Sequence, residues 1–163
     1  MYTTNTKVRT VSLHKKDVYF DADFLSLYYS DTVAGDLPTK ADRIATETQA
    51  EGGNRIIHRL CNHRVADLRQ HIEKVLEEES VESSDDTLES GDWTFTIRIT
   101  IEAEDNIFPA LADLFHDYVV NGALADWYAH LGVQGNRESL QNRADADLAR
   151  IRELIYHRPM PTI

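Results

Sequence analysis

The clearest pattern along the chain is the alternation of apolar and polar residues in WTFTIRITI (93–101), where every second residue is Trp, Phe or Ile. Because successive side chains of a strand point to opposite faces, this alternation predicts a half-buried β-strand. A lone strand leaves its backbone N–H and C=O groups unpaired, so it requires a partner. The short β-branched segment VRTVSL (8–13) is the candidate partner within the chain, and a neighbouring subunit is the alternative.

Helical spacing of apolar residues begins directly after that first strand, in KKDVYFDADFLSLYYSD (15–31). One face of the predicted helix carries Val18, Ala22, Leu25 and Tyr29. Four more apolar residues widen this face: Phe20, Phe24, Leu27 and Tyr28. We therefore expect the helix to be buried on more than one side. The segment TVAGDLPTK (32–40), which contains Gly and Pro, predicts a loop after it.

Two capping boxes compete for the start of the next helix: Thr39-x-x-Asp42 and Thr48-x-x-Glu51. We favour the second, which places Gly52 and Gly53 in the early turns. The helical repeat then continues through Ile57, Cys61, Leu68, Ile72 and Val75. We expect this helix to end near Glu79, because acidic residues crowd a helix terminus whose dipole disfavours them.

Two further helices are predicted in the C-terminal half. Residues 104–132 carry apolar side chains around most of the helix circumference, so this helix is expected at the centre of the fold. Asp105 or Asn106 is its expected cap, and Pro109 is expected in its first turn. GVQG (132–135) predicts a turn, after which Asn136 is expected to cap the last helix. That helix should end near Tyr156 or His157, and its apolar residues form one stripe: Leu140, Ala144, Leu148, Ile151 and Ile155.

The predicted fold class is therefore α+β and mostly helical, with about four helices packed against a small two-stranded sheet in the order β-α-α-β-α-α. With 163 residues, the chain fits one domain, which we place at 1–156, followed by an extended C-terminal arm at 157–163. The single cysteine excludes an internal disulfide framework and fits a reducing compartment. We expect a soluble protein made in the cytoplasm, since neither a signal peptide nor a membrane span is evident.

The net charge of −11 is concentrated in one segment. Residues 77–92 hold eight acids and no base, and without them 20 acids face 17 bases, or −3. These acids are Glu77, Glu78, Glu79, Glu82, Asp85, Asp86, Glu89 and Asp92. The segment is interpreted either as a solvated loop or as a surface that repels another polyanion. Binding of nucleic acid through a basic face is disfavoured, because the arginines are interleaved with acids.

The sequence contains little that indicates catalysis or cofactor binding. His58, Cys61 and His63 suggest a metal site, but His63 points away from His58 on a helix and no second Cys/His pair supplies the remaining ligands. Cys61 is therefore expected to be a core thiol. Trp127 and Tyr128 lie among leucines at helical spacing and are expected in the core.

The remaining polar candidates also lack the arrangement that catalysis needs. His116 and Asp117 lack a neighbouring nucleophile, whereas Asp145 and Asp147 diverge on a helix. We expect a protein that is not an enzyme, with no catalytic residues, no metal and no cofactor.

Several of these segments resemble a group of small virion-structure proteins of tailed phages and prophages of Bacteroidales. The similarity includes the aromatic-rich VYFDADFLSLYYSD, the Cys-bearing IIHRLCNH, and DYVVNGALADW (117–127), which fits the form D-Y-hydrophobic-V-N-x-x-L-x-x-W. It also includes the C-terminal LIYHRPMP, of the form I-Y-x-R-x-x-P. The long acidic stretch at 77–92 departs from the pattern.

The resemblance implies a structural protein of the phage neck, either a head–tail connector (adaptor) or a tail-completion (terminator) protein. Such proteins form homo-oligomeric rings between portal and tail proteins, in the virion, with DNA passing through without specific binding and without a membrane. The acidic segment would then face the DNA channel and repel phosphates. Outside phages, the alternative is a non-catalytic protein-interaction module.

The C-terminal arm is the other element for which this resemblance suggests a role. Its apolar and basic residues are expected to grip a neighbour, and its prolines keep it extended. The residues concerned are Tyr156, His157, Arg158, Pro159, Met160, Pro161 and Ile163.

Overall fold

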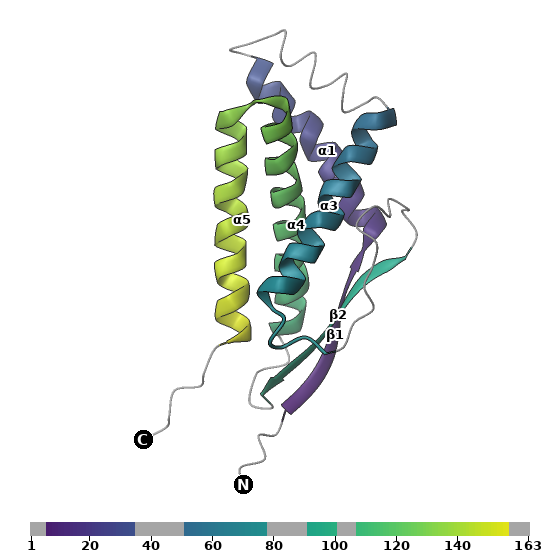
Figure 1. The fold of residues 1–163 in the computed structure, drawn as a ribbon, viewed down its shortest axis with the longest axis vertical. Helices are drawn as coiled ribbons and strands as arrows, with labels where there is room; N and C mark the ends of the chain where they lie inside the picture. Colours follow the sequence, from purple (N-terminus) through teal and green to yellow (C-terminus); the bar gives the residue numbers. More distant parts are fainter. Residues whose placement is uncertain (1–5, 35–50, 78–90, 101–106, 157–163) are drawn as a thin grey trace.

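The computed structural model of the chain describes residues 6–34, 51–77, 91–100 and 107–156. These residues form four helices and a two-stranded antiparallel sheet, in the predicted order β-α-α-β-α-α (Figure 1). The elements are β1 (Thr6–His14), α1 (Lys15–Ala34), α3 (Glu51–His71), β2 (Asp92–Thr100), α4 (Ile107–Leu131) and α5 (Gln134–Ile155). The α+β, mostly helical fold class predicted from the sequence is confirmed.

The two predicted strands pair with each other, so the partner of β2 lies within the chain. The register runs from Thr6 opposite Thr100 to His14 opposite Asp92. The apolar residues of β2 turn inward, and Trp93, Phe95 and Ile97 are almost completely buried. Alternation of side chains along the strand therefore predicted both the strand and its buried face.

Helix α4 is the centre of the fold, as its all-round hydrophobicity predicts. It packs against α5, α3, α1 and β1, and Figure 1 shows α5 running beside it on the side away from the sheet. Its buried residues are Leu111, Phe115, Tyr118, Val119, Val120, Gly122, Ala123, Leu124, Ala125, Trp127, Tyr128 and Leu131. The predicted core positions of Cys61, Trp127 and Tyr128 are confirmed, since at most 1% of each residue is exposed.

Helix α3 ends at His71, well before the predicted end near Glu79. After a turn, Leu76 forms a β-bridge with Ile97. The Arg98 N–H donates to the Val75 carbonyl (2.8 Å) and the Glu77 N–H donates to the Thr96 carbonyl (2.8 Å). The chain leaves the helix because β2 offers it these hydrogen bonds, a long-range contact that helical periodicity does not reveal.

The turn between α4 and α5 is shorter than predicted. Gly132 adopts a positive φ of 76°, its N–H donates to the Ala129 carbonyl, and the Val133 N–H donates to the Tyr128 carbonyl. This is the Schellman arrangement of a helix C-terminus. It positions Val133 so that α5 starts at once, and Asn136 therefore lies inside the first turn instead of capping it. The predicted end of α5 near Tyr156 is confirmed.

The prediction that α1 is buried on more than one side is wrong for two of its aromatic residues. Val18 and Ala22 are fully buried, but Phe20 and Phe24 are 67% and 58% exposed. Residues 32–34, expected in a loop, still belong to α1. Several predicted features lie outside the described residues: the side chains of Leu27, Tyr28 and Tyr29, both capping boxes' first residues (Thr39 and Thr48), Ile101, and the cap candidates Asp105 and Asn106.

Candidate functional site

Of the predicted arm residues, the structure describes Tyr156, and residues 157–163 lie outside the described part. Tyr156 is the C-cap of α5, and its N–H donates to the Arg152 carbonyl (2.9 Å). Its side chain is 42% exposed. An exposed aromatic ring therefore stands at the end of α5, directly before residues 157–163 in the sequence.

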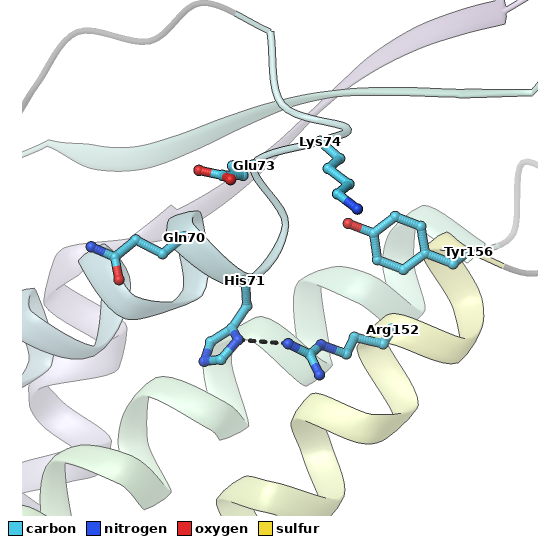
Figure 2. Close-up of a pocket in the computed structure, with 6 residues that line it drawn as sticks. All are labelled: Gln70, His71, Glu73, Lys74, Arg152 and Tyr156. Atoms are coloured by element: carbon cyan, nitrogen blue, oxygen red, sulfur yellow. Dashed lines mark hydrogen bonds between the residues drawn. The ribbon is translucent and has the colours of Figure 1, made fainter.

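The base of the arm adjoins a cleft of about 570 Å³. We call it the arm-base cleft; its lining is Gln70, His71, Glu73, Lys74, Arg152 and Tyr156 (Figure 2). Arg152 Nη2 donates to His71 Nδ1 (2.8 Å), which ties the last turn of α5 to the end of α3. Because a guanidinium only donates, His71 accepts through an unprotonated Nδ1. Figure 2 shows the Lys74 amine and the Tyr156 hydroxyl pointing toward each other.

The polar groups of the arm-base cleft are suited to binding an anionic group. Lys74 and Arg152 bring two positive charges, and Glu73 brings the one carboxylate of the lining. Hydrogen-bond donors of this kind recognise carboxylates. The chemistry that the cleft supports is therefore the docking of an acidic group.

The acidic segment is attached to the sheet at both of its ends. Glu77 forms an ion pair with Arg98, and Asp92 forms one with His14 (2.7 Å). The hydrogen bond and charge of Asp92 raise the pKa of His14. The other six acids of the segment, Glu78, Glu79, Glu82, Asp85, Asp86 and Glu89, lie outside the described residues. Two of the eight charges are thus engaged in pairs within the domain.

The sequence analysis missed an exposed aromatic pair on α1. The rings of Phe20 and Phe24 stack at a centroid separation of 6.3 Å. At about 100° per residue, Phe20 lies roughly 200° around the helix from the buried Val18, so the spacing itself placed it opposite the apolar stripe. Large apolar groups exposed together mark interaction surfaces more often than single ones do.

Two of the three residues in the histidine and cysteine cluster on α3, His58 and Cys61, are buried in the core. His58 Nε2 hydrogen-bonds Asp23 Oδ2 (2.9 Å), and its ring stacks on Tyr19 at 4.0 Å. Burial, with a smaller contribution from the Asp23 charge, raises the pKa of the Cys61 thiol far above its usual range. A protonated, buried thiol is neither a nucleophile nor a metal ligand. His63 is exposed, away from both.

A second polar cluster joins α3 to the two C-terminal helices. The Arg64 guanidinium donates to both carboxylate oxygens of Asp126 and to Gln141 Oε1, each at 2.8 Å. Burial alone lowers the pKa of Arg64, but the Asp126 hydrogen bond and charge outweigh it and hold the group charged. Gly122 lies under the arginine stem, and a Cβ there would come within 2.7 Å of it.

The remaining sequence candidates are held apart in separate pairs. His116 Nε2 hydrogen-bonds Asp21 (2.6 Å), while Asp147 accepts from Asn121 (3.1 Å) and Asp145 accepts from Gln141 (2.9 Å). Partial burial raises the pKa of Asp147, and the Asn121 hydrogen bond opposes this shift. The divergence of the two aspartates, predicted from their spacing, is confirmed.

Within the described ranges, no group of three or more His, Cys, Asp or Glu side chains is placed to hold a metal ion. None of the helices in that part of the chain combines the length and hydrophobicity that crossing a bilayer requires. Comparison with family models, with curated proteins and with solved structures gives no match for this chain.

Proposed function

We propose that this protein is a structural subunit of a tailed-phage virion, a member of a neck ring that joins portal to tail. The observation that carries the proposal is the exposed Phe20–Phe24 pair, because an assembly subunit needs an apolar surface that is solvated only before assembly. The sequence resemblance to small phage virion proteins supplies the setting. The proposal assigns the chain no catalysis.

The aromatic pair offers a useful amount of binding energy. Full burial of a phenylalanine contributes about 1.5–3 kcal/mol, so covering two side chains that are 67% and 58% exposed would contribute roughly 2–4 kcal/mol. That amount is comparable to the contribution of a typical hot spot. In a ring, each such contact recurs between every pair of neighbours, because the interface is heterologous.

The remaining features fit the same role. The acidic segment would face the DNA channel, where negative charge lets DNA slide. The arm, from Tyr156 onward, would grip a neighbouring subunit. The arm-base cleft, with Lys74 and Arg152, would receive an acidic side chain of a portal or tail protein.

Native mass spectrometry tests the proposal on the full chain, alone and mixed with portal and tail proteins of a phage that encodes it. We expect a ring, or a complex with one of these ring-shaped partners. The double variant Phe20→Ser, Phe24→Ser should lose it, while the matched control Phe20→Tyr, Phe24→Tyr retains an aromatic surface and should assemble. A chain that stays monomeric with every portal and tail protein would refute the neck role.

Separate tests address the acidic segment and the arm. Replacing Glu78, Glu79, Glu82, Asp85, Asp86 and Glu89 by their amides should slow DNA ejection, and unchanged ejection would leave a solvated loop as the interpretation. Phage particles built with a chain that lacks residues 157–163 should assemble poorly. Normal assembly of such particles would exclude the gripping role of the arm.

A further inference from the structure

The outer edge of β1 presents backbone groups that β2 does not use. The hydrogen bonds from Arg98 to Val75 and from Glu77 to Thr96 show that even-numbered residues of β2 direct their N–H and C=O groups away from β1. In an antiparallel pair, the odd-numbered residues of β2 therefore bond to β1. The register places Phe95 opposite Val11, so odd-numbered residues of β1 face β2.

It follows that Val8, Thr10 and Ser12 direct their backbone groups outward from the sheet. A side-chain contact agrees with this geometry: Arg9 Nη1 donates to the Val8 carbonyl (2.9 Å), which β2 leaves accessible. Among the described residues, the sheet contains β1 and β2 alone, and the bridge at Leu76 lies on the β2 side. All three outward-facing residues are exposed.

The edge carries only part of the usual protection against strand addition. Natural sheet edges are blocked by charged side chains, prolines or bulges. Val8, Thr10 and Ser12 are uncharged, but β1 also carries Lys7 and Arg9, and the Arg9 guanidinium donates to the outward-facing Val8 carbonyl. The nine-residue strand contains no proline and pairs with β2 in continuous register, without a bulge. An incoming strand would replace the Arg9 side chain at the Val8 carbonyl and find the other outward-facing groups of this edge accessible.

The sequence of the C-terminal arm is suited to pairing on one side only. Pro159 and Pro161 are two residues apart, so an extended arm places both missing N–H groups on the same side. Arg158, Met160 and Thr162 then present all their N–H and C=O groups on the other side. Prolines also keep the residues before them extended. Such a segment adds to an edge and ends the sheet, the position in which strand prolines are tolerated.

The arm of the same chain is poorly placed to reach this edge. The arm starts at Tyr156, beside the end of α3, and the order from there across the sheet is the 75–77 segment, β2 and then β1. Crossing three strands takes about 14 Å at 4.8 Å per strand, whereas residues 157–163 span at most roughly 23 Å. Too little chain would remain to pair along β1.

We propose that the C-terminal arm of one copy binds the outer edge of β1 in a neighbouring copy as an added strand. Arg158, Met160 and Thr162 pair with the backbone of Val8, Thr10 and Ser12. The inference deepens the proposed neck role by naming the receiving surface, and it rests on that role for its ring geometry. Donor arm and receiving edge are different surfaces, so the contact runs head to tail, the arrangement that a ring of subunits requires.

Cysteine cross-linking of full-length chains tests this contact. One isotopically labelled variant carries Thr162→Cys, and the other carries Thr10→Cys or Ser12→Cys; native Cys61 is buried and does not compete. The cross-linker is a short bismaleimide, and the protein is at about 1 mM, a concentration at which even a millimolar Kd leaves about half of the β1 edges occupied. We expect a mixed covalent dimer. Asn142→Cys, on the exposed surface of α5, serves as the control that should not cross-link. A missing mixed dimer, or an intrachain link in a chain carrying both cysteines, overturns the proposal.

A second pair of variants isolates the backbone bond. In Val8→Pro the outward N–H is removed while the bonds to β2 remain, and Val8→Ala removes the side chain alone. Val8→Pro should lower the cross-link yield by about two- to tenfold relative to Val8→Ala, as expected for one lost hydrogen bond. Equal yields overturn the strand pairing. A chain that cross-links but never joins portal or tail proteins refutes the neck role alone, and rings without the cross-link refute the strand addition alone.

Discussion

Replacing Gly122 by alanine should destabilise this protein, although a glycine-to-alanine change in an exposed helix usually stabilises a protein. The baseline gain is about 0.5–1 kcal/mol, because alanine loses less backbone entropy on folding than glycine. At Gly122 the new Cβ would lie 2.7 Å from both Cδ and Nε of Arg64. An unrestrained arginine would move aside at little cost. Arg64 is instead held by three hydrogen bonds of 2.8 Å to Asp126 and Gln141.

The magnitude follows from this restraint. Moving Nε to ordinary contact distance lengthens its bond to Asp126 beyond hydrogen-bonding range, and a bond to a charged group contributes about 1.5–3 kcal/mol. The Asp126 side chain is 38% exposed, so solvent screening favours the lower half of that range. Subtracting the baseline gain leaves a net loss of about 0.5–1.8 kcal/mol, or roughly 1–7 °C in Tm for a chain of this size.

Urea and thermal unfolding followed by circular dichroism measure the effect. Gly135 provides the matched control, because it lies in α5 and a Cβ there meets nothing within 4 Å; Gly135→Ala should raise the free energy of unfolding by about 0.4–1 kcal/mol. In an Arg64→Met background, Gly122→Ala should become neutral or stabilising. A higher Tm for Gly122→Ala in the wild-type background would refute the reasoning.

Two further substitutions and one reactivity measurement test other side chains of the fold. Asp126→Asn should lower the free energy of unfolding by about 2–3 kcal/mol in urea titrations, because it leaves the Arg64 charge buried without a counter-charge; a loss below about 0.5 kcal/mol would contradict this pairing. The Cys61 thiol, whose pKa burial raises, should not react with a thiol reagent at about pH 8 until the protein is unfolded. The raised pKa of His14 beside Asp92 means that this pair stabilises the fold below about pH 6.5 and that the contribution disappears as pH rises through the folded-state pKa. His14→Gln should therefore lower Tm at about pH 5.5 and leave it nearly unchanged at about pH 8, and an equal effect at both would exclude the pair as its cause.

Local patterns in the sequence predicted most of the fold. Alternation predicted β2 and its buried face, and apolar residues around most of the helix circumference in residues 104–132 predicted the central helix. These predictions were correct because the buried residues of a strand or a helix recur along the sequence with the same period as the backbone of that element. The same kind of periodicity, in the helix that contains Cys61, predicted that this residue lies in the core.

The features that local patterns did not predict depend on contacts between distant segments. The early end of α3 depends on hydrogen bonds from 75–77 to β2, and helical spacing through Val75 fits both conformations. The start of α5 depends on the Schellman bonds that follow Tyr128. The arm-base cleft joins Lys74 to Arg152, which are far apart in sequence, so neither residue stood out. Exposure of Phe20, by contrast, was present in the spacing and was overlooked.

The attachment of the acidic segment to the sheet leaves its length free to change. Leu76 is fixed at Ile97 and the chain rejoins the sheet at Asp92, about 17 Å along β2 at 3.4 Å per residue. The entropy of closing the intervening loop, residues 78–90, rises by only about 0.6 kcal/mol for each doubling of its length. We therefore expect insertions and deletions there to cost the fold little. Related proteins can therefore diverge most at this position, and a reporter peptide inserted there would have the least effect on the domain.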